Sequence, residues 1–440
     1  MNATSEHLTQ SSFYQCEAEQ IRSDIPVLRS LQQQGLADFR RLGFPERRDE
    51  DWRYTSVHGF LKHSFRHAPC SSLQDSESLA TVMAHRQDDV PWGHKIAYVD
   101  GKLVGLDALH AALPPGVLVM PILEALQEHP TKITPHLNQI VQVNHGFQAQ
   151  NTAMLQLGLF IYVPENICIP EPILVVHWQT HVDQALYLRH VMVAESGAQL
   201  TVIEDYQGES NLRYYTNTIT ELYAGSNALL KHYKIQRESR SAYHVGHLAA
   251  KLATSSQVES HVLSLGGQWA RSDVCVDMSE SRANCQLNGV YALNDQQHMD
   301  HHTWVYHNVP DCTSAQDYKG ILTGQSRGVF NGQVHVAQDA QRTIARQQNK
   351  NLLLSQQAEI DTKPQLDIAA DDVQCTHGAT VGQLDEEALF YFATRGIDET
   401  VARHYLIQAF VAENLKSVGH DTLSSWMSVL LNQHMGSHNE

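Results

Sequence analysis

Apolar and polar residues alternate in short runs through the middle of the chain, over residues 151–384. Typical runs are "LGLFIYVPENICI", "AQLTVIEDY", "GVFNGQVHVA" and "PQLDIAADDVQC", and small or polar residues separate them. A period of two is typical of strands that bury one face, whereas helices repeat apolar residues every three to four positions. The pattern therefore predicts that this part of the chain is almost entirely β-structure.

The runs also recur at a fixed interval. Val329, Thr343, Ala358 and Val373 hold similar places in successive runs, 14 to 15 residues apart. A fixed period of short strands indicates a solenoid, in which each coil buries its face by stacking on its neighbours. A β-sandwich is the alternative, but Asn-Gly or Asp-Gly hairpin turns do not separate the runs. A parallel β-helix with coils of about 30 residues is the favoured prediction.

The N-terminal part, residues 1–150, has a mixed pattern led by helices. Residues 13–42 have helical spacing and end at a glycine and a proline, and residues 121–130 predict a second, short helix. Residues 94–106 predict a β-hairpin that turns at Asp100-Gly101. The apolar positions of the first helix are Ile21, Leu28, Leu31 and Leu36.

The C-terminal part, residues 385–440, changes to helical periodicity. Asp385 and Asp398 stand where N-caps are expected, and a third amphipathic segment contains Leu423, Leu430 and Leu431. So small a unit cannot bury all of its apolar residues, and surplus apolar surface usually marks a partner site. We expect the β-helix to fold without this domain. The predicted partner-docking residues are Phe390, Tyr391, Phe392, Phe410 and Trp426.

Composition narrows the function. The formal net charge is −17, and such acidity disfavours binding to nucleic acid or to an anionic membrane surface. The start of the chain has no basic and apolar signal segment, and no apolar stretch approaches the roughly 18 residues of a membrane span. The seven cysteines contain no CxxC pair, which argues against a disulfide framework or a structural zinc site. These features predict a cytoplasmic protein.

Nucleotide and zinc-protease motifs are missing from the sequence. GxxxxGK[ST], GxGxxG and HExxH do not occur. Any ATP used together with this protein must therefore be bound by another chain.

One segment concentrates histidines, "QQHMDHHTWVYHN". In a strand, His298, Asp300 and His302 would share one face and could bind iron or zinc. The alternative is a polar ladder in which His298, His301, His302 and His307 bond neighbouring coils. No Cys or Glu completes a metal shell locally, so we expect these histidines to be structural.

A second segment, "DDVQCTHGATVG", places Cys375 and His377 two residues apart. In a strand they share a side with Val373, which suggests that they face inward or into an interface. The pair could hold iron in a cluster, or act as a nucleophile with its base, or be a small buried thiol beside a satisfied histidine. The residues alone leave these three possibilities open.

The sequence resembles the SufB/SufD family of the SUF iron–sulfur cluster assembly machinery. The matching pieces are "FNG", "NLLL", "AEIDTKP", "ADDVQCTHGATVG" and "LFYFATRGI", with support from the histidine segment and from "DEDWRYT" near the start. SufB-type chains carry "EHEAT" where this chain has Thr376-His377-Gly378-Ala379-Thr380, so the resemblance is to the SufD type. It implies a right-handed parallel β-helix flanked by helical domains, in agreement with the periodicity.

The resemblance also implies a function. A chain of this kind is expected to be a non-catalytic scaffold that pairs with a SufB paralogue and binds a SufC ATPase through its C-terminal domain. His377 would contribute to a transient iron–sulfur cluster at the SufB junction, whereas Cys375 keeps a structural role. The isolated chain would bind no cofactor tightly, and its exposed β-helix flank makes a homodimer plausible. The competing hypotheses are a β-helix enzyme acting on polysaccharide and a stand-alone His-rich metalloprotein using residues 298–307.

Overall fold

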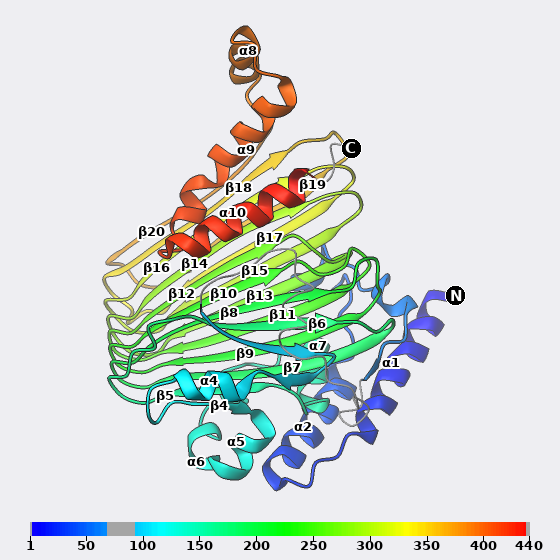
Figure 1. The fold of residues 1–440 in the computed structure, drawn as a ribbon, viewed down its shortest axis with the longest axis vertical. Coiled ribbons are helices and arrows are strands. Elements are labelled where there is room, and N and C mark those ends of the chain that lie inside the picture. Colours follow the sequence, from blue (N-terminus) through cyan, green and yellow to red (C-terminus); the bar gives the residue numbers. More distant parts are fainter. Residues whose placement is uncertain (1, 68–92, 437–440) are drawn as a thin grey trace.

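The computed structural model describes residues 2–67 and 93–436, and its centre is a parallel β-solenoid (Figure 1). Successive strands alternate between two sheets, so each coil contributes one strand to each. The first sheet contains β5 Leu159–Val163, β7 Gln184–Ala194, β9 Tyr215–Ala224, β11 Tyr243–Leu252, β13 Trp269–Met278, β15 His298–His307, β17 Arg327–Val336 and β19 Glu359–Ile368. The second contains β6 Ile173–Gln179, β8 Gln199–Gly208, β10 Leu229–Gln236, β12 Gln257–Ser264, β14 Asn284–Leu293, β16 Thr313–Leu322, β18 Thr343–Leu353 and β20 Val373–Gly382.

The strand register confirms the predicted repeat. Trp269 pairs with His298, and His298 pairs with Arg327, a step of 29 residues each time. Thr343 pairs with Val373, as the periodicity predicted. Val329 pairs with Asp361 and not with Ala358, because Ala358 belongs to the turn that precedes β19. The two sheets enclose an apolar core of inward-facing side chains.

The first coil is closed. β2 His94–Val99 and β3 Lys102–Val104 form the predicted hairpin about Asp100-Gly101, and β2 continues the second sheet beside β6. β4 Leu118–Pro121 ends the first sheet antiparallel to β5, while β1 Arg66–His67 pairs with β7. The helix α4 Leu106–Ala112 covers this end, and its Leu109 is buried in the core.

N-terminal elements cover the outer face of the first sheet. α1 Asn2–Gln20 and α2 Pro26–Leu42 are two helices, so the single helix predicted over residues 13–42 is wrong; Pro26 starts a new helix after the break. The other elements on this side are the one-turn helices η1 Glu50–Trp52 and η2 Phe60–Lys62, and α5 Ile122–Glu128, α6 Pro130–Ile133 and α7 Gly146–Ala153. Aromatic side chains of this layer pack on an aromatic row at the start of β9, β11 and β13.

C-terminal helices cover the outer face of the second sheet. α9 Glu399–Lys416 and α10 Asp421–Gly436 pack on strands β10, β12, β14 and β16, whereas α8 Glu386–Thr394 stands away from the solenoid (Figure 1). Asp385 and Asp398 are N-caps, as predicted, and accept bonds from the backbone N–H of Glu387 and Thr400. No helix among the described residues is long and apolar enough to cross a membrane.

Candidate functional site

The second end of the solenoid is open. β19 and β20 are the last strands of their sheets, and within the described residues no element covers them. Their side chains are half-buried or exposed along nearly the whole length of both strands, whereas the strands of earlier coils are largely buried. Each of these edges therefore presents unpaired backbone donors and acceptors, the arrangement through which sheets bind another chain. We call the surface formed by residues 359–368 and 373–382 the open end.

His377 and Cys375 both lie on β20 at the open end. Their neighbours on β18 are Gln347 and Ala345, which are buried between the sheets. Cys375 packs at the margin of the core beside Val373, which confirms the predicted inward side. His377 follows in the same column but is exposed, because no further coil covers it. Its ring makes no hydrogen bond or ion pair with another described residue.

The thiol of Cys375 is placed as a packing group. Its pKa is raised by partial burial, and the resulting neutral thiol is a poor iron ligand because metals bind the thiolate. A nucleophile–base pair is equally unsupported, since no hydrogen bond joins Cys375 to His377 in this part of the structure. Of the two side chains, His377 is the more exposed.

The inward column behind His377 is polar, which the sequence analysis missed. Gln347 lies 3.4 Å from Gln316 on the preceding coil. Asn349 bonds Tyr291 at 3.1 Å and Thr362 at 2.8 Å. The signal was present in "RQQNKN", where every second polar residue falls on the inward face of β18. Amide side chains thus replace aliphatic packing just below the open end.

The predicted docking residues separate into two groups. Phe390 and Tyr391 on α8 are 72% and 57% exposed, and the Phe392 ring stacks 6.2 Å from the ring of Tyr405. Trp426 is a correction to the prediction, since α10 buries it against the second sheet to 7% exposure. Phe410 is half-buried, with the ammonium of Lys319 over its ring. Most of the exposed large apolar side chains of this domain therefore lie on α8 and the first half of α9, and Val429 on α10 is a further one.

Hydrogen bonds join the C-terminal helices to the solenoid, and folding of the β-helix without residues 385–440 stays a prediction. The Tyr233 hydroxyl donates to the Val418 carbonyl at 2.6 Å, and Asn414 donates to the backbone of Asp317 at 2.7 Å. Deleting the domain would expose the apolar outer face of the second sheet. Its helices are part of the fold as well as a candidate docking unit.

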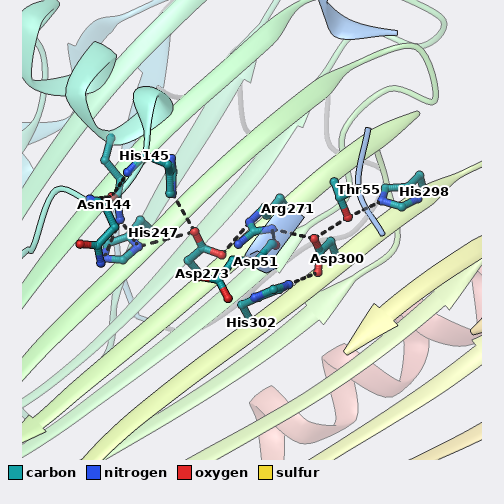
Figure 2. A network of polar contacts seen from close by, with 11 residues as sticks. Asp51, Thr55, Asn144, His145, His247, Arg271, Asp273, His298, Asp300 and His302 are labelled. Carbon is teal, nitrogen blue, oxygen red and sulfur yellow. Dashed lines mark hydrogen bonds and ion pairs between the residues drawn. The ribbon is translucent and has the colours of Figure 1, made fainter. Parts of the chain in front are cut away.

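The histidine segment lies on β15 in two different environments. His298 and His302 point outward with Asp300, into a buried network beneath the N-terminal layer (Figure 2). Thr55 bridges Asp300 and His298. Its hydroxyl donates to the Asp300 carboxylate at 2.5 Å and lies 3.0 Å from His298 Nε2. Burial alone would raise the pKa of Asp300, but His302 and Arg271 lower it to about 2. Asp300 is therefore ionised and is held by Thr55, Arg271 and His302.

The other two histidines point inward. The His301 ring lies between the rings of Tyr291 and Tyr318, and His307 Nε2 lies 2.8 Å from the hydroxyl of Ser314. Burial lowers the pKa of both imidazoles to about 4, so they are neutral at neutral pH. The residues that the structure describes contain no group of three His, Cys, Asp or Glu side chains placed to hold a metal ion.

A catalytic serine motif that the sequence analysis overlooked also has a structural explanation. Gly324-Gln325-Ser326-Arg327-Gly328 matches GxSxG. Ser326 is fully buried in the turn before β17 and donates to the Leu293 carbonyl at 3.4 Å. The motif needs an exposed hydroxyl on a turn between a strand and a helix, so this match is accidental.

Comparisons with known proteins identify the family. Residues 177–410 match the family "SUF system FeS cluster assembly, SufBD core domain", and residues 4–175 match "SufBD protein N-terminal region". The chain is 31% identical to the iron–sulfur cluster assembly protein SufD of Escherichia coli over 92% of both chains. It is 27% identical to SufD of Bacillus subtilis over 88% of this chain and 89% of that one.

A third relative, an iron–sulfur cluster assembly SufBD family protein of Synechocystis, is 30% identical over 88% of this chain and 86% of its own length. The N-terminal family model matches residues 4–175, a region to which the sequence analysis assigned no function. The matched regions span the N-terminal layer, the whole solenoid and the start of the C-terminal helices. This chain belongs to the SufBD family of the SUF iron–sulfur cluster assembly system.

Proposed function

We propose that this chain is a SufD-type scaffold subunit for iron–sulfur cluster assembly. It pairs through the open end with a SufB-type paralogue, and the transient cluster forms at their junction. The observation that carries the proposal is the exposed His377 ring, set in the inward column of a coil that nothing covers. Two strands of a second solenoid would continue the two sheets, one each, and would enclose the ring.

His377 supplies an imidazole nitrogen to the nascent cluster, opposite ligands from the partner. A single neutral imidazole binds iron more weakly than thiolates do, which suits a cluster that has to be passed on. Since one ligand cannot retain iron, the isolated chain is expected to bind it poorly. The chain itself is non-catalytic in this proposal, and ATP hydrolysis belongs to a SufC-type partner.

The ATPase docks on α8 and the first half of α9. Phe390 and Tyr391 expose large apolar surfaces on elements that stand clear of the solenoid, and Val401 and Tyr405 continue the surface at 44% and 50% exposure. Aromatic side chains of this kind are frequent anchors of protein interfaces. Phe390→Ala should weaken ATPase binding without unfolding the chain.

The decisive experiment is co-expression of the chain with SufB-type and SufC-type partners. His377→Ala should leave complex formation and ATP hydrolysis within about twofold, while cluster content of the purified complex falls at least roughly tenfold, because a cluster ligand is lost and not a contact. Gln374→Ala, an exposed change on the same strand, is the matched control and should retain the cluster. Normal cluster content in the His377→Ala complex would contradict the assignment.

A further inference from the structure

A cleft of about 400 Å³ lies between the N-terminal layer and the outer face of the first sheet. Its size falls within the roughly 300–1,000 Å³ typical of small-ligand sites. Trp52 and the segment around residues 42–51 form one wall, residues 142–148 another, and β11, β13 and β15 the floor. The cleft contains neither His377 nor any α8 residue, so it is separate from the surfaces used in the proposed function.

Aromatic side chains form part of the cleft. Trp304 and Tyr306 follow His302 on the outward side of β15, beyond the part that Thr55 covers, and both are half-buried. Trp52, on the opposite side, already holds a cation, since the Arg271 guanidinium lies 3.9 Å from the centre of its ring. Guanidinium groups stack on aromatic faces more readily than other cations because they are planar and weakly hydrated.

Arg271, on the floor of the cleft, is held by carboxylates. It bonds Asp273, which also lines the cleft, and Asp300, which lies outside it, each at 2.9 Å, and all three side chains are essentially inaccessible (Figure 2). The positive charge of Arg271 is therefore offset by buried carboxylates.

The rim of the cleft is acidic. Asp49 and Asp51 are exposed there, while Glu50 is paired with Lys363 at 2.9 Å. Burial is the main cause that raises the pKa of the Cys275 thiol in the cleft to about 12, and Asp277 and Asp273 contribute to the rise. An anionic ligand would be repelled, and the described residues offer no three-ligand metal site here.

We propose that this cleft binds an organic cation, a guanidinium or alkylammonium group held against Trp304 and Tyr306 with the carboxylates of Asp49 and Asp51 around it. A guanidinium group suits the two rings better than an ammonium, because it is planar and more weakly hydrated.

The test is a titration of the full chain with N-acetyl-argininamide, in which binding is measured by tryptophan fluorescence and by calorimetry. N-acetyl-citrullinamide has nearly the same shape without the charge and should bind at least about tenfold more weakly, a difference expected for a cation desolvated against aromatic rings.

Variants locate the site. Trp304→Ala should abolish binding, and Asp51→Asn should weaken it by about 2- to 5-fold, since an exposed cation interaction contributes roughly 0.5–1 kcal/mol. The exposed Asp51 side chain makes this variant safe for folding, and Asp371→Asn, outside the cleft, is its matched control. Equal binding of the citrulline and arginine compounds, no binding of either, or full binding by Trp304→Ala would each overturn the proposal.

Discussion

The two ends of the solenoid are finished in different ways. At the first end, β3 and β4 turn antiparallel to their neighbours and α4 places Leu109 in the core. At the other end, β19 and β20 keep the parallel register and stop with half-buried side chains. Stacked-repeat proteins need terminal caps to stay soluble. Among the described residues, the second end lacks such a cap, which is what the proposed pairing with another chain requires.

The comparison also separates two kinds of histidine. In the closed coils, His301 is buried between two tyrosine rings and His307 is buried against the hydroxyl of Ser314, whereas in the last coil His377 is exposed. Burial makes a histidine part of the fold, and exposure in an inward column makes it available to a partner. The predictions below test this contrast between the closed coils and the open end.

The largest expected effect is acid instability from the closed coils. Burial lowers the pKa of His298, His301 and His307 from the ordinary 6.5 to about 4. Their unfolded forms bind protons below pH 6.5, but the folded forms do not until about pH 4. The stability is thus fully present above pH 6.5 and is lost as the pH falls toward 4, at about 1.4 kcal/mol per pH unit for each histidine.

Urea unfolding of the isolated chain between pH 8 and pH 4.5 measures this slope. His301→Asn should reduce the slope by close to one proton, and its free energy of unfolding at pH 8 gives the packing cost without titration. The same variant should still assemble clusters with its partners. An unchanged slope would mean that His301 is protonated in the folded chain.

Core truncations at the two ends should differ in size. Leu109→Ala should lower the free energy of unfolding by about 2–5 kcal/mol, because it removes a fully buried side chain at the capped end. Leu366→Ala changes a half-buried side chain at the open end and should cost less than half as much. In the complex with a SufB-type partner, the cost of Leu366→Ala should rise. Equal costs in the free chain would remove the distinction between the ends.

A charge on the open edge should interfere with pairing alone. Val381 is 49% exposed near the end of β20, and a lysine there is a known means by which proteins block strand addition. Val381→Lys should weaken partner binding by roughly tenfold, because the interface would have to take the added charge out of water. Val182→Lys, at 61% exposure outside the open end, is the control. The measurements are the partner-binding constant and the melting temperature of each variant, and only the binding constant of Val381→Lys should change.

The smallest effect is expected from Cys375→Ser. The thiol is half-buried and packs at the core margin, so the change should cost about 1 kcal/mol of stability and leave cluster yield within about twofold. A large loss of cluster from a well-folded complex would give the thiol a ligand role instead.

Much of the fold could be predicted from local pattern. The period of the strands, the hairpin at Asp100-Gly101 and the caps Asp385 and Asp398 each depend on residues close together in sequence, and the structure confirms them. What the helices cover could not be predicted, because burial of Trp426 against β-strands depends on contacts far apart in sequence. The same limit applied to the site. The alternation of side chains along the strand predicted the side on which His377 lies, but it could not predict that no further coil covers this strand.

The register of the strands has a consequence for the order of folding. Each strand pairs with the strand one coil away in sequence. Coils can therefore form one after another by closing short loops. The contact of Arg271 with the Asp51 carbonyl joins residues 220 positions apart, and that of Tyr233 with Val418 joins residues 185 apart. The N-terminal layer and the C-terminal helices can dock only after the strands beneath them exist. An emerging chain would therefore expose the outer face of the second sheet until α9 and α10 are made, near the end of synthesis, and in that interval it would depend on chaperones more than the finished protein does.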